Sequence, residues 1–184
     1  MLPLYDLTLR PMEEKDLVMV LNWRNSEHVR RYSLTDHIIK LDDHQKWYRN
    51  LDKDPTCEWL IAELKNEPIG VVSITDINSQ DGTCTWGMYI GENVGNLGVG
   101  VLLEIRAIDR IFNHHGVRKL WGQALKSNRI LMTHKRFGFV EEGILRNHVF
   151  RNGNYEDIIL VALFAEQWPE KRKEIFNTFN LVDK

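Results

Sequence analysis

The sequence predicts an α/β protein, layered in the α+β manner, in which helices flank one central, twisted, mixed and mostly antiparallel sheet. Two observations predict this class. Segments of alternating or β-branched apolar residues are interspersed with segments of helical apolar spacing. Asp81-Gly82 and Asn152-Gly153 are hairpin turn signals between such segments. At 184 residues the chain is long enough for one domain with a substantial core.

The first half of the chain begins with an expected strand at 5–12, which Pro11 closes. A helix follows at 13–25, with acidic residues in its first turn, where the helix dipole favours them. Asp42 is a plausible N-cap for a second helix. Three strands joined by polar turns then follow, at 57–64, 68–77 and 83–90.

The second half begins with a glycine-rich loop and an amphipathic helix that ends at Gly116. A strand is expected at 118–126, and after it a helix that Gly138 stops. A long hairpin over 143–164 and a short helix after Trp168 complete the order. We therefore expect the helices to cover a single sheet.

Composition limits the classes of partner. A formal net charge of −2 gives no electrostatic reason for nucleic acid or an acidic membrane. The first sixteen residues lack a basic segment followed by an apolar one, so we predict no signal peptide and a cytoplasmic protein. Cys57 and Cys84 have no metal-ligand spacing, and no metal is expected.

Four of the ten residues 91–100 are glycine, directly before a helix. Glycine allows close approach of backbone to a ligand, so the loop indicates an anion cradle at a helix N-terminus; the alternative is a plain surface loop. A Rossmann fingerprint would follow the first strand, and a Walker loop would end in Gly-Lys-Ser/Thr. Gly95-x-x-Gly98-x-Gly100 fits neither motif.

This loop resembles the pyrophosphate loop of the Gcn5-related N-acetyltransferases (GNAT), Gln/Arg-x-x-Gly-x-Gly/Ala after the fourth strand. Gly98 and Gly100 fill the glycine places, whereas Gly95 stands where Gln or Arg is usual. "SNRILMTHKRFGFVEEG" is similar to the family's helix ending in Lys-x-Gly-Phe-x-x-Glu-Gly. The order of elements agrees along nearly the whole chain. The resemblance implies a single acetyltransferase domain over residues 1–184.

The resemblance also implies acetyl-CoA as co-substrate. Helix N-terminal amides would bind its pyrophosphate, and the strand 86–90 would lie beside the pantetheine. A bulge near Gly87-Met88 would splay the sheet and free an amide to polarise the thioester carbonyl; the alternative for Gly87 is a packing role. The predicted acetyl-CoA contacts are Met88, Tyr89, Ile90, Gly95, Asn96, Gly98, Val99, Gly100, Asn128 and Lys135.

The acceptor is indicated by a narrower resemblance. "LNWRNSEHVRRYS", "HQKW", "PIGVVSITDIN" and "WGMYIGE" together resemble the UDP-4-amino-4,6-dideoxy-N-acetyl-β-L-altrosamine N-acetyltransferases of pseudaminic acid biosynthesis. The predicted partner is therefore a small-molecule amine, a nucleotide sugar, and a homodimer is left open. The predicted contacts are Arg24, Tyr32, His44, Trp47 and Thr75.

Residue chemistry fits a nucleotide sugar. Arg24 suits a diphosphate, because its planar fork binds phosphate bidentately, and Tyr32 and Trp47 offer stacking faces. The alternative is that Trp47 belongs to the core and His44 is solvated. A polyamine acceptor would need a site lined with acidic residues. This alternative stays open because the chain has Asp36, Asp42, Asp43 and Asp76. A protein N-terminal acetyltransferase and a non-catalytic acyl-CoA-binding module also stay open.

Catalysis needs a proton for the departing thiolate. By the resemblance, His134 takes the place of a tyrosine that usually supplies it, and imidazole donates a proton near neutral pH. The alternative is a surface histidine. Ser73 and Thr75 share one strand face and would hold a water that removes the amine's proton, although neither is itself a base. Gln123 stands where a carboxylate could have served, so no strong general base is predicted.

Overall fold

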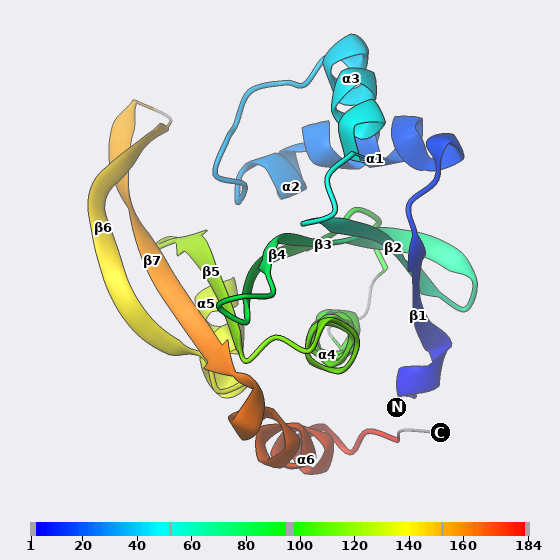
Figure 1. Cartoon of the computed structure of the whole chain (residues 1–184). Helices are drawn as coiled ribbons and strands as arrows, with labels where there is room; N and C mark the ends of the chain where they lie inside the picture. Colours follow the sequence, from blue (N-terminus) through cyan, green and yellow to red (C-terminus); the bar gives the residue numbers. More distant parts are fainter. Residues whose placement is uncertain (1–2, 52, 95–97, 152, 183–184) are drawn as a thin grey trace.

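A seven-stranded sheet organises the computed structural model, which describes residues 3–51, 53–94, 98–151 and 153–182 (Figure 1). The strand order is β1-β2-β3-β4-β5-β7-β6. Every neighbouring pair is antiparallel except β4 and β5, which run parallel. The predicted mixed and mostly antiparallel sheet is confirmed.

The strands and helices lie close to the predicted ranges. The strands are β1 (Leu7–Pro11), β2 (Glu58–Leu64), β3 (Glu67–Asn78), β4 (Thr83–Ile90), β5 (Lys119–Leu125), β6 (Val140–Arg151) and β7 (Asn154–Phe164). The helices are α1 (Leu17–Asn25), α2 (Glu27–Arg30), α3 (Leu41–Leu51), α4 (Val99–Arg110), α5 (Ile130–Arg136) and α6 (Trp168–Phe179). No helix in the described part of the chain is long and apolar enough to cross a membrane.

The N-terminal elements are shorter than predicted. Residues Leu4–Asp6 form a 3-10 turn, so β1 begins only at Leu7. The predicted helix at 13–25 starts as a 3-10 turn over Glu14–Asp16 and continues as α1 from Leu17. The Asp16 carboxylate closes this start by accepting hydrogen bonds from Arg10 and from the Glu13 backbone. The one-turn helix α2 was not predicted.

The sheet has an apolar layer on each face. Helices α1 and α3 cover one face of β2–β4, where Val20 and Trp23 pack against Ile61 and Val71 (Figure 1). Helix α4 covers the other face with the larger cluster, which includes Leu60, Val72, Ile74, Leu102 and Ile108. Alternation along β3 therefore directs Ser73 and Thr75 toward the α1 and α3 side.

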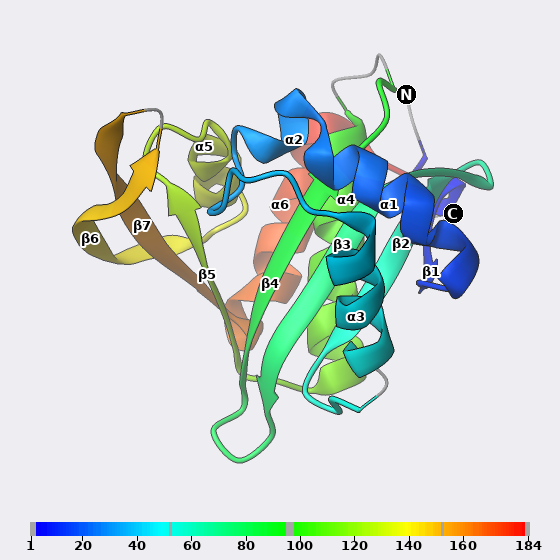
Figure 2. The same ribbon diagram turned by 90° about the horizontal axis from the view of Figure 1, so that it is seen from above.

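The sheet opens between β4 and β5. Their ladder consists of three residue pairs, Thr83–Thr85 with Lys119–Trp121, although both strands continue well beyond it. Figure 2 shows β5 and the β6–β7 hairpin diverging from β4. Past Thr85, β4 has no ladder partner on that side within the described residues. The middle of the sheet is thus split.

The predicted bulge near Gly87-Met88 is wrong. The β3–β4 register continues without interruption from Gly70↔Ile90 to Thr75↔Thr85. The irregularity lies between Thr75 and Asn78 of β3, where Asp76 has a left-handed φ of 51°. Divergence of β5 from a regular β4, and not a bulge in β4, opens the sheet.

Candidate active site

A cavity of about 870 Å³ lies at the split in the sheet. One side is lined by β4 residues Trp86–Ile90, and the other by β5 residues Trp121–Ala124. Side chains from α1–α3 close it over one face, and α5 contributes at the split. The cavity therefore connects groups that lie on both faces of the sheet, as a site for two reacting molecules requires.

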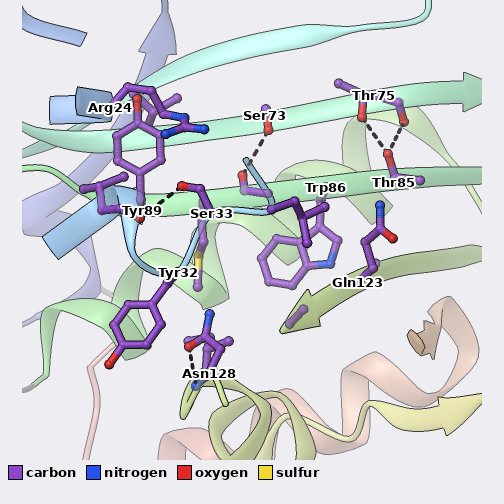
Figure 3. A pocket seen from close by; sticks show the side chains of 18 of the residues that line it. Arg24, Tyr32, Ser33, Ser73, Thr75, Thr85, Trp86, Tyr89, Gln123 and Asn128 are labelled. Carbon is purple, nitrogen blue, oxygen red and sulfur yellow. Dashed lines mark hydrogen bonds between the residues drawn. The ribbon is translucent and has the colours of Figure 1, made fainter. Parts of the chain in front are cut away.

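Arg24 lies on the α1 side of the cavity, beside Tyr89 (Figure 3). Its Nη2 donates to the Thr35 carbonyl at 2.9 Å and to Thr35 Oγ1 at 2.7 Å. Its Nη1 is buried and has no hydrogen-bond partner among the described residues. Burial lowers the pKa of Arg24, and the nearby Arg151 and Arg30 lower it further. A guanidinium in this position favours an incoming oxygen or anion.

Two more arginines lie behind Arg24. Arg151, from the β6–β7 hairpin, donates to the carbonyl oxygens of Ser33 and Arg30. Arg30 donates in turn to the Asp36 carbonyl at 2.7 Å. These contacts brace the segment 31–36, which carries Tyr32 at the cavity wall. Sequence reasoning missed this brace, because it joins residues more than a hundred positions apart.

His44 and Trp47 occupy one face of α3, and both line the cavity. Their rings stack at 4.8 Å, and Trp47 meets Trp59 edge-on at 4.7 Å. His44 is only 5% exposed, so the alternative of a solvated histidine is wrong. Burial lowers its pKa, and Nε2 has no partner among the described residues. Trp47 belongs to the core and to the cavity wall at once.

Ser73 and Thr75 both line the cavity, but their hydroxyl groups are already engaged (Figure 3). Ser73 Oγ donates to the Gly87 carbonyl at 3.3 Å. Thr75 Oγ1 and Thr85 Oγ1 are 2.5 Å apart. A Cβ on Gly87 would stand 3.2 Å from Ser73 Oγ, so glycine here also serves packing. Each hydroxyl oxygen keeps a lone pair for a water or an amine.

Several predicted acetyl-CoA contacts lie together at the split, where Met88, Tyr89, Ile90 and Asn128 line the cavity. Tyr89 directs its ring toward Arg24, away from the side that Met88 and Ile90 share with α4 (Figure 3). The Asn128 carboxamide oxygen accepts from the Ile130 amide at 3.0 Å, in the turn that leads into α5.

Other predicted contacts lie outside the cavity. Gly98 is the N-cap of α4, and Val99 and Gly100 form its first turn, which contains no acidic residue. A Cβ on Gly100 would meet no atom within 4 Å. Lys135 is exposed on α5 and does not line the cavity. Gly95 and Asn96 fall outside the described residues.

His134 lies at the split and lines the cavity. It is 8% exposed and packs against Trp86 and Phe139, each 5.2 Å away between ring centroids. The alternative of a solvated surface histidine is therefore wrong. Its Nδ1 is 2.7 Å from Oε1 of Glu104, a fully buried carboxyl on α4.

Glu104 was missed by sequence reasoning, although a signal existed. It stands four residues before Ile108 and seven before Ile111, on the buried face of its helix. A charged residue at such a position requires a buried partner.

A second carboxylate–histidine pair, Glu58 and His115, lies away from the cavity. His115 Nε2 is 2.9 Å from Glu58, which also accepts from Arg110. His115 is therefore half-buried in a contact with a carboxylate, whereas His114 is exposed. Ligand atoms of Glu58, His114 and His115 lie within 4.8 Å of one another. Arg110 already neutralises that carboxylate, which disfavours a cation there.

Fold and cavity together define an α/β enzyme with a split sheet. A family model described as an acetyltransferase (GNAT) domain matches residues 6–140. The chain belongs to the GNAT acetyltransferase family, and it is an acetyl-CoA-dependent N-acetyltransferase. This finding excludes a purely non-catalytic module.

Individual relatives are distant. Spermidine N(1)-acetyltransferase of Vibrio cholerae is 25% identical over 154 residues, which cover 83% of this chain and 89% of the relative. Acetyltransferase PseH of Campylobacter jejuni is 22% identical over 95 residues, 52% of this chain and 59% of the relative. The crystal structure of V. cholerae spermidine N-acetyltransferase with CoA and spermine superposes with a TM-score of 0.84 at 23% identity, covering 90% and 99% of the two chains.

Proposed function

We propose that this chain, as one domain over residues 1–184, acetylates the amino group of a small acceptor that carries an anionic, oxygen-rich group. A UDP-linked 4-amino-deoxysugar is the candidate acceptor. The observation that carries this proposal is Arg24, which lines the cavity and whose buried Nη1 has no hydrogen-bond partner among the described residues. A phosphate oxygen would satisfy that donor, whereas an ammonium group would be repelled by it.

The split sheet and the start of α4 fit acetyl-CoA. β4 past Thr85 offers backbone groups that no described strand pairs on the β5 side, and an extended pantetheine arm can add to such an edge. The first turn of α4 has no carboxylate, and Gly100 leaves open space beside its backbone. Amide groups there would hold the pyrophosphate. The thioester would then lie near Ser73 and His134.

The proposed reaction is direct attack. The neutral amine nitrogen forms a bond to the thioester carbonyl carbon, and the C–S bond breaks with its electron pair leaving on sulfur. His134 Nε2 gives a proton to that sulfur, producing the CoA thiol. The proton that the amine loses passes to a water held by Ser73 and Thr75, and from there to solvent. Gln123 is exposed and offers no carboxylate for this step.

Spermidine is the second candidate acceptor, because relatives that cover most of this chain carry that name. The cavity lining includes Asp43 and Asp76, both exposed, which would attract a polyamine. The positive charge of Arg24 at the cavity wall opposes a polyamine, and Arg30 and Arg151 lie close enough to Arg24 to add to it. Charge at the buried end of the cavity therefore favours the anionic acceptor, and sequence likeness favours the cationic one.

A thiol-release assay with acetyl-CoA separates these acceptors. UDP-4-amino-4,6-dideoxy-N-acetyl-β-L-altrosamine, spermidine and peptides with free N-termini are compared by kcat/KM. The nucleotide sugar should be preferred. Arg24→Ala should raise its KM about tenfold or more, the cost of roughly 1.5–3 kcal/mol expected for a charged hydrogen bond. The KM for acetyl-CoA should stay unchanged.

Arg24→Lys is the matched variant, because it keeps the charge and loses the fork. It should restore part of the affinity for a diphosphate. Turnover of spermidine at a higher kcat/KM than the nucleotide sugar, with Arg24→Ala improving it, would reverse the assignment.

A further inference from the structure

His134 at the split forms a hydrogen-bonded pair with Glu104, a residue of another helix. Glu104 is fully buried on α4, and the described structure gives its carboxyl one hydrogen bond, from Oε1 to His134 Nδ1 at 2.7 Å. Its other oxygen, Oε2, is buried and has no hydrogen-bond partner among the described residues. The described interaction of this buried carboxyl is thus with the His134 ring.

Among the described residues, those that pack against the His134 ring carry no charge besides Glu104. Trp86 and Phe139 flank the His134 ring and are uncharged. Lys135 and Arg136, the following residues of α5, are exposed. Burial raises the pKa of the Glu104 carboxyl, and the hydrogen bond and charge of His134 lower it. Glu104 and His134 therefore form one hydrogen-bonded unit, and its protons are considered together.

The number of protons on the Glu104–His134 pair determines whether Nε2 of His134 is protonated. If the unit is neutral overall, either a carboxylate faces an imidazolium or a protonated carboxyl faces a neutral ring. In both cases the hydrogen bond occupies Nδ1, and a proton remains on Nε2. Removing that proton leaves one uncompensated negative charge in a dry interior, which is costly. The neutral unit thus keeps Nε2 protonated.

We propose that Glu104 is a positioning residue that keeps a proton on Nε2 of His134, the nitrogen left for the cavity, so that the pair is loaded to protonate the departing thiolate. This rests on the proposed function. The C–S electron pair accepts the Nε2 proton, and the pair is left with one negative charge shared across the hydrogen bond. A proton from solvent then restores the neutral unit before the next turnover. Sulfur receives one proton and the pair loses one, so the step balances.

Long-range ¹H–¹⁵N NMR of the His134 ring nitrogens tests the proposal without any substrate. In the wild-type protein Nε2 should be protonated at pH 7, and in Glu104→Gln it should lose that proton at lower pH. Glu104→Asp keeps the charge on a shorter side chain and should recover part of the wild-type behaviour. A folded Glu104→Gln protein with an unchanged His134 titration would overturn the proposal.

Kinetics give the second readout. Glu104→Gln should lower kcat at pH 8 about tenfold and move the basic limb of kcat to lower pH by about one unit, because each unit changes the protonated fraction tenfold. The KM values for acetyl-CoA and for the acceptor should stay within about twofold, because Glu104 is fully buried and is not proposed to contact either substrate.

Glu58→Gln is the matched control, since it alters a second carboxylate–histidine pair outside the cavity. It should leave the kcat profile unchanged. An equal shift in both variants would assign the effect to general electrostatics and overturn the proposal. The NMR result stands whichever acceptor is used, so failure of the nucleotide-sugar assignment remains distinguishable from failure of this one.

Discussion

The buried polar groups around the cavity fall into two kinds: some have a hydrogen-bond partner in the protein, and others have none among the described residues. The Glu104 carboxyl has a protein partner in His134, whereas Arg24 Nη1 and His44 Nε2 have none among the described residues. An unpaired buried donor costs stability unless a ligand completes it. Substitutions of the paired groups should therefore change stability and rate, and substitutions of the unpaired groups should change acceptor binding.

His134→Ala should lower kcat about 10²-fold with little change in either KM, because a proton donor acts mainly in the transition state. The same change leaves Glu104 buried without its partner and should cost about 1–3 kcal/mol of stability in urea unfolding. Adding Glu104→Gln should restore stability but not kcat. His134→Tyr should recover part of the rate, because a phenol also donates a proton. Wild-type kcat in His134→Ala would remove this residue from the mechanism.

Gly100 and Gly116, near the two ends of the segment 99–116, have different structural roles. Gly100 has ordinary helical backbone, and a Cβ there would meet nothing within 4 Å. Gly116 has a left-handed φ of 62° at the helix end, which a side chain would strain. Gly91, at the start of the same glycine-rich stretch, is required for packing, because a Cβ would lie 2.1 Å from the Trp23 ring. One stretch of glycines thus serves packing at one end and leaves space at the other.

Gly100→Ala should stabilise the fold by up to about 1 kcal/mol, through helix propensity, while weakening acetyl-CoA binding. A methyl group would occupy the open space beside the first turn, where the pyrophosphate is proposed to bind. Calorimetric titration and thermal unfolding measure the two effects. Gly116→Ala is the control and should lower stability without changing affinity. An unchanged Kd in Gly100→Ala would place the pyrophosphate elsewhere.

Arg151 connects the β6–β7 hairpin to the segment that holds Arg24. Arg151→Ala should raise the acceptor KM several-fold and leave the KM for acetyl-CoA unchanged, because it frees the segment 31–36 whose Thr35 holds Arg24. Lys126→Ala breaks an exposed ion pair with Asp157 of the same hairpin and should have little effect. Equal effects of both variants on the acceptor KM would attribute them to the hairpin as a whole.

Across the whole molecule, periodicity and turn residues predicted the strand order in sequence but not the split. The alternation of β3 and β4, the Asp81-Gly82 turn and the Gly138 stop each depend on residues that are close in sequence, where local rules apply. The end of the β4–β5 ladder at Thr85, the Arg151 brace and the Glu104–His134 pair join residues 30 to 121 positions apart. Such contacts depend on how the layers pack, and no local pattern encodes them.

Stability of the whole molecule should fall with acid in two stages. Burial lowers the pKa of His44 below its ordinary value near 6.5, so the unfolded chain binds its proton first and folding weakens as pH falls below that value. Burial raises the pKa values of Asp16 and Glu58, but hydrogen bonds from Arg10 to Asp16 and from Arg110 to Glu58 outweigh it, so both values are lowered. Their contribution is present above the unfolded values near 4 and is lost as pH falls through the folded ones.

Thermal unfolding from pH 8 to pH 3 measures both stages, and each 1 kcal/mol lost should lower Tm by roughly 2–4 °C in a chain of this size. His44→Gln cannot take up a proton, so it should remove the first stage and leave the second. His148→Gln, at an exposed position on β6, is the matched control and should retain both stages. If the fall in Tm between pH 7 and pH 5 is the same in His44→Gln as in the wild type, the neutral burial of His44 is not what makes the fold sensitive to mild acid. The first stage would then have to come from another group.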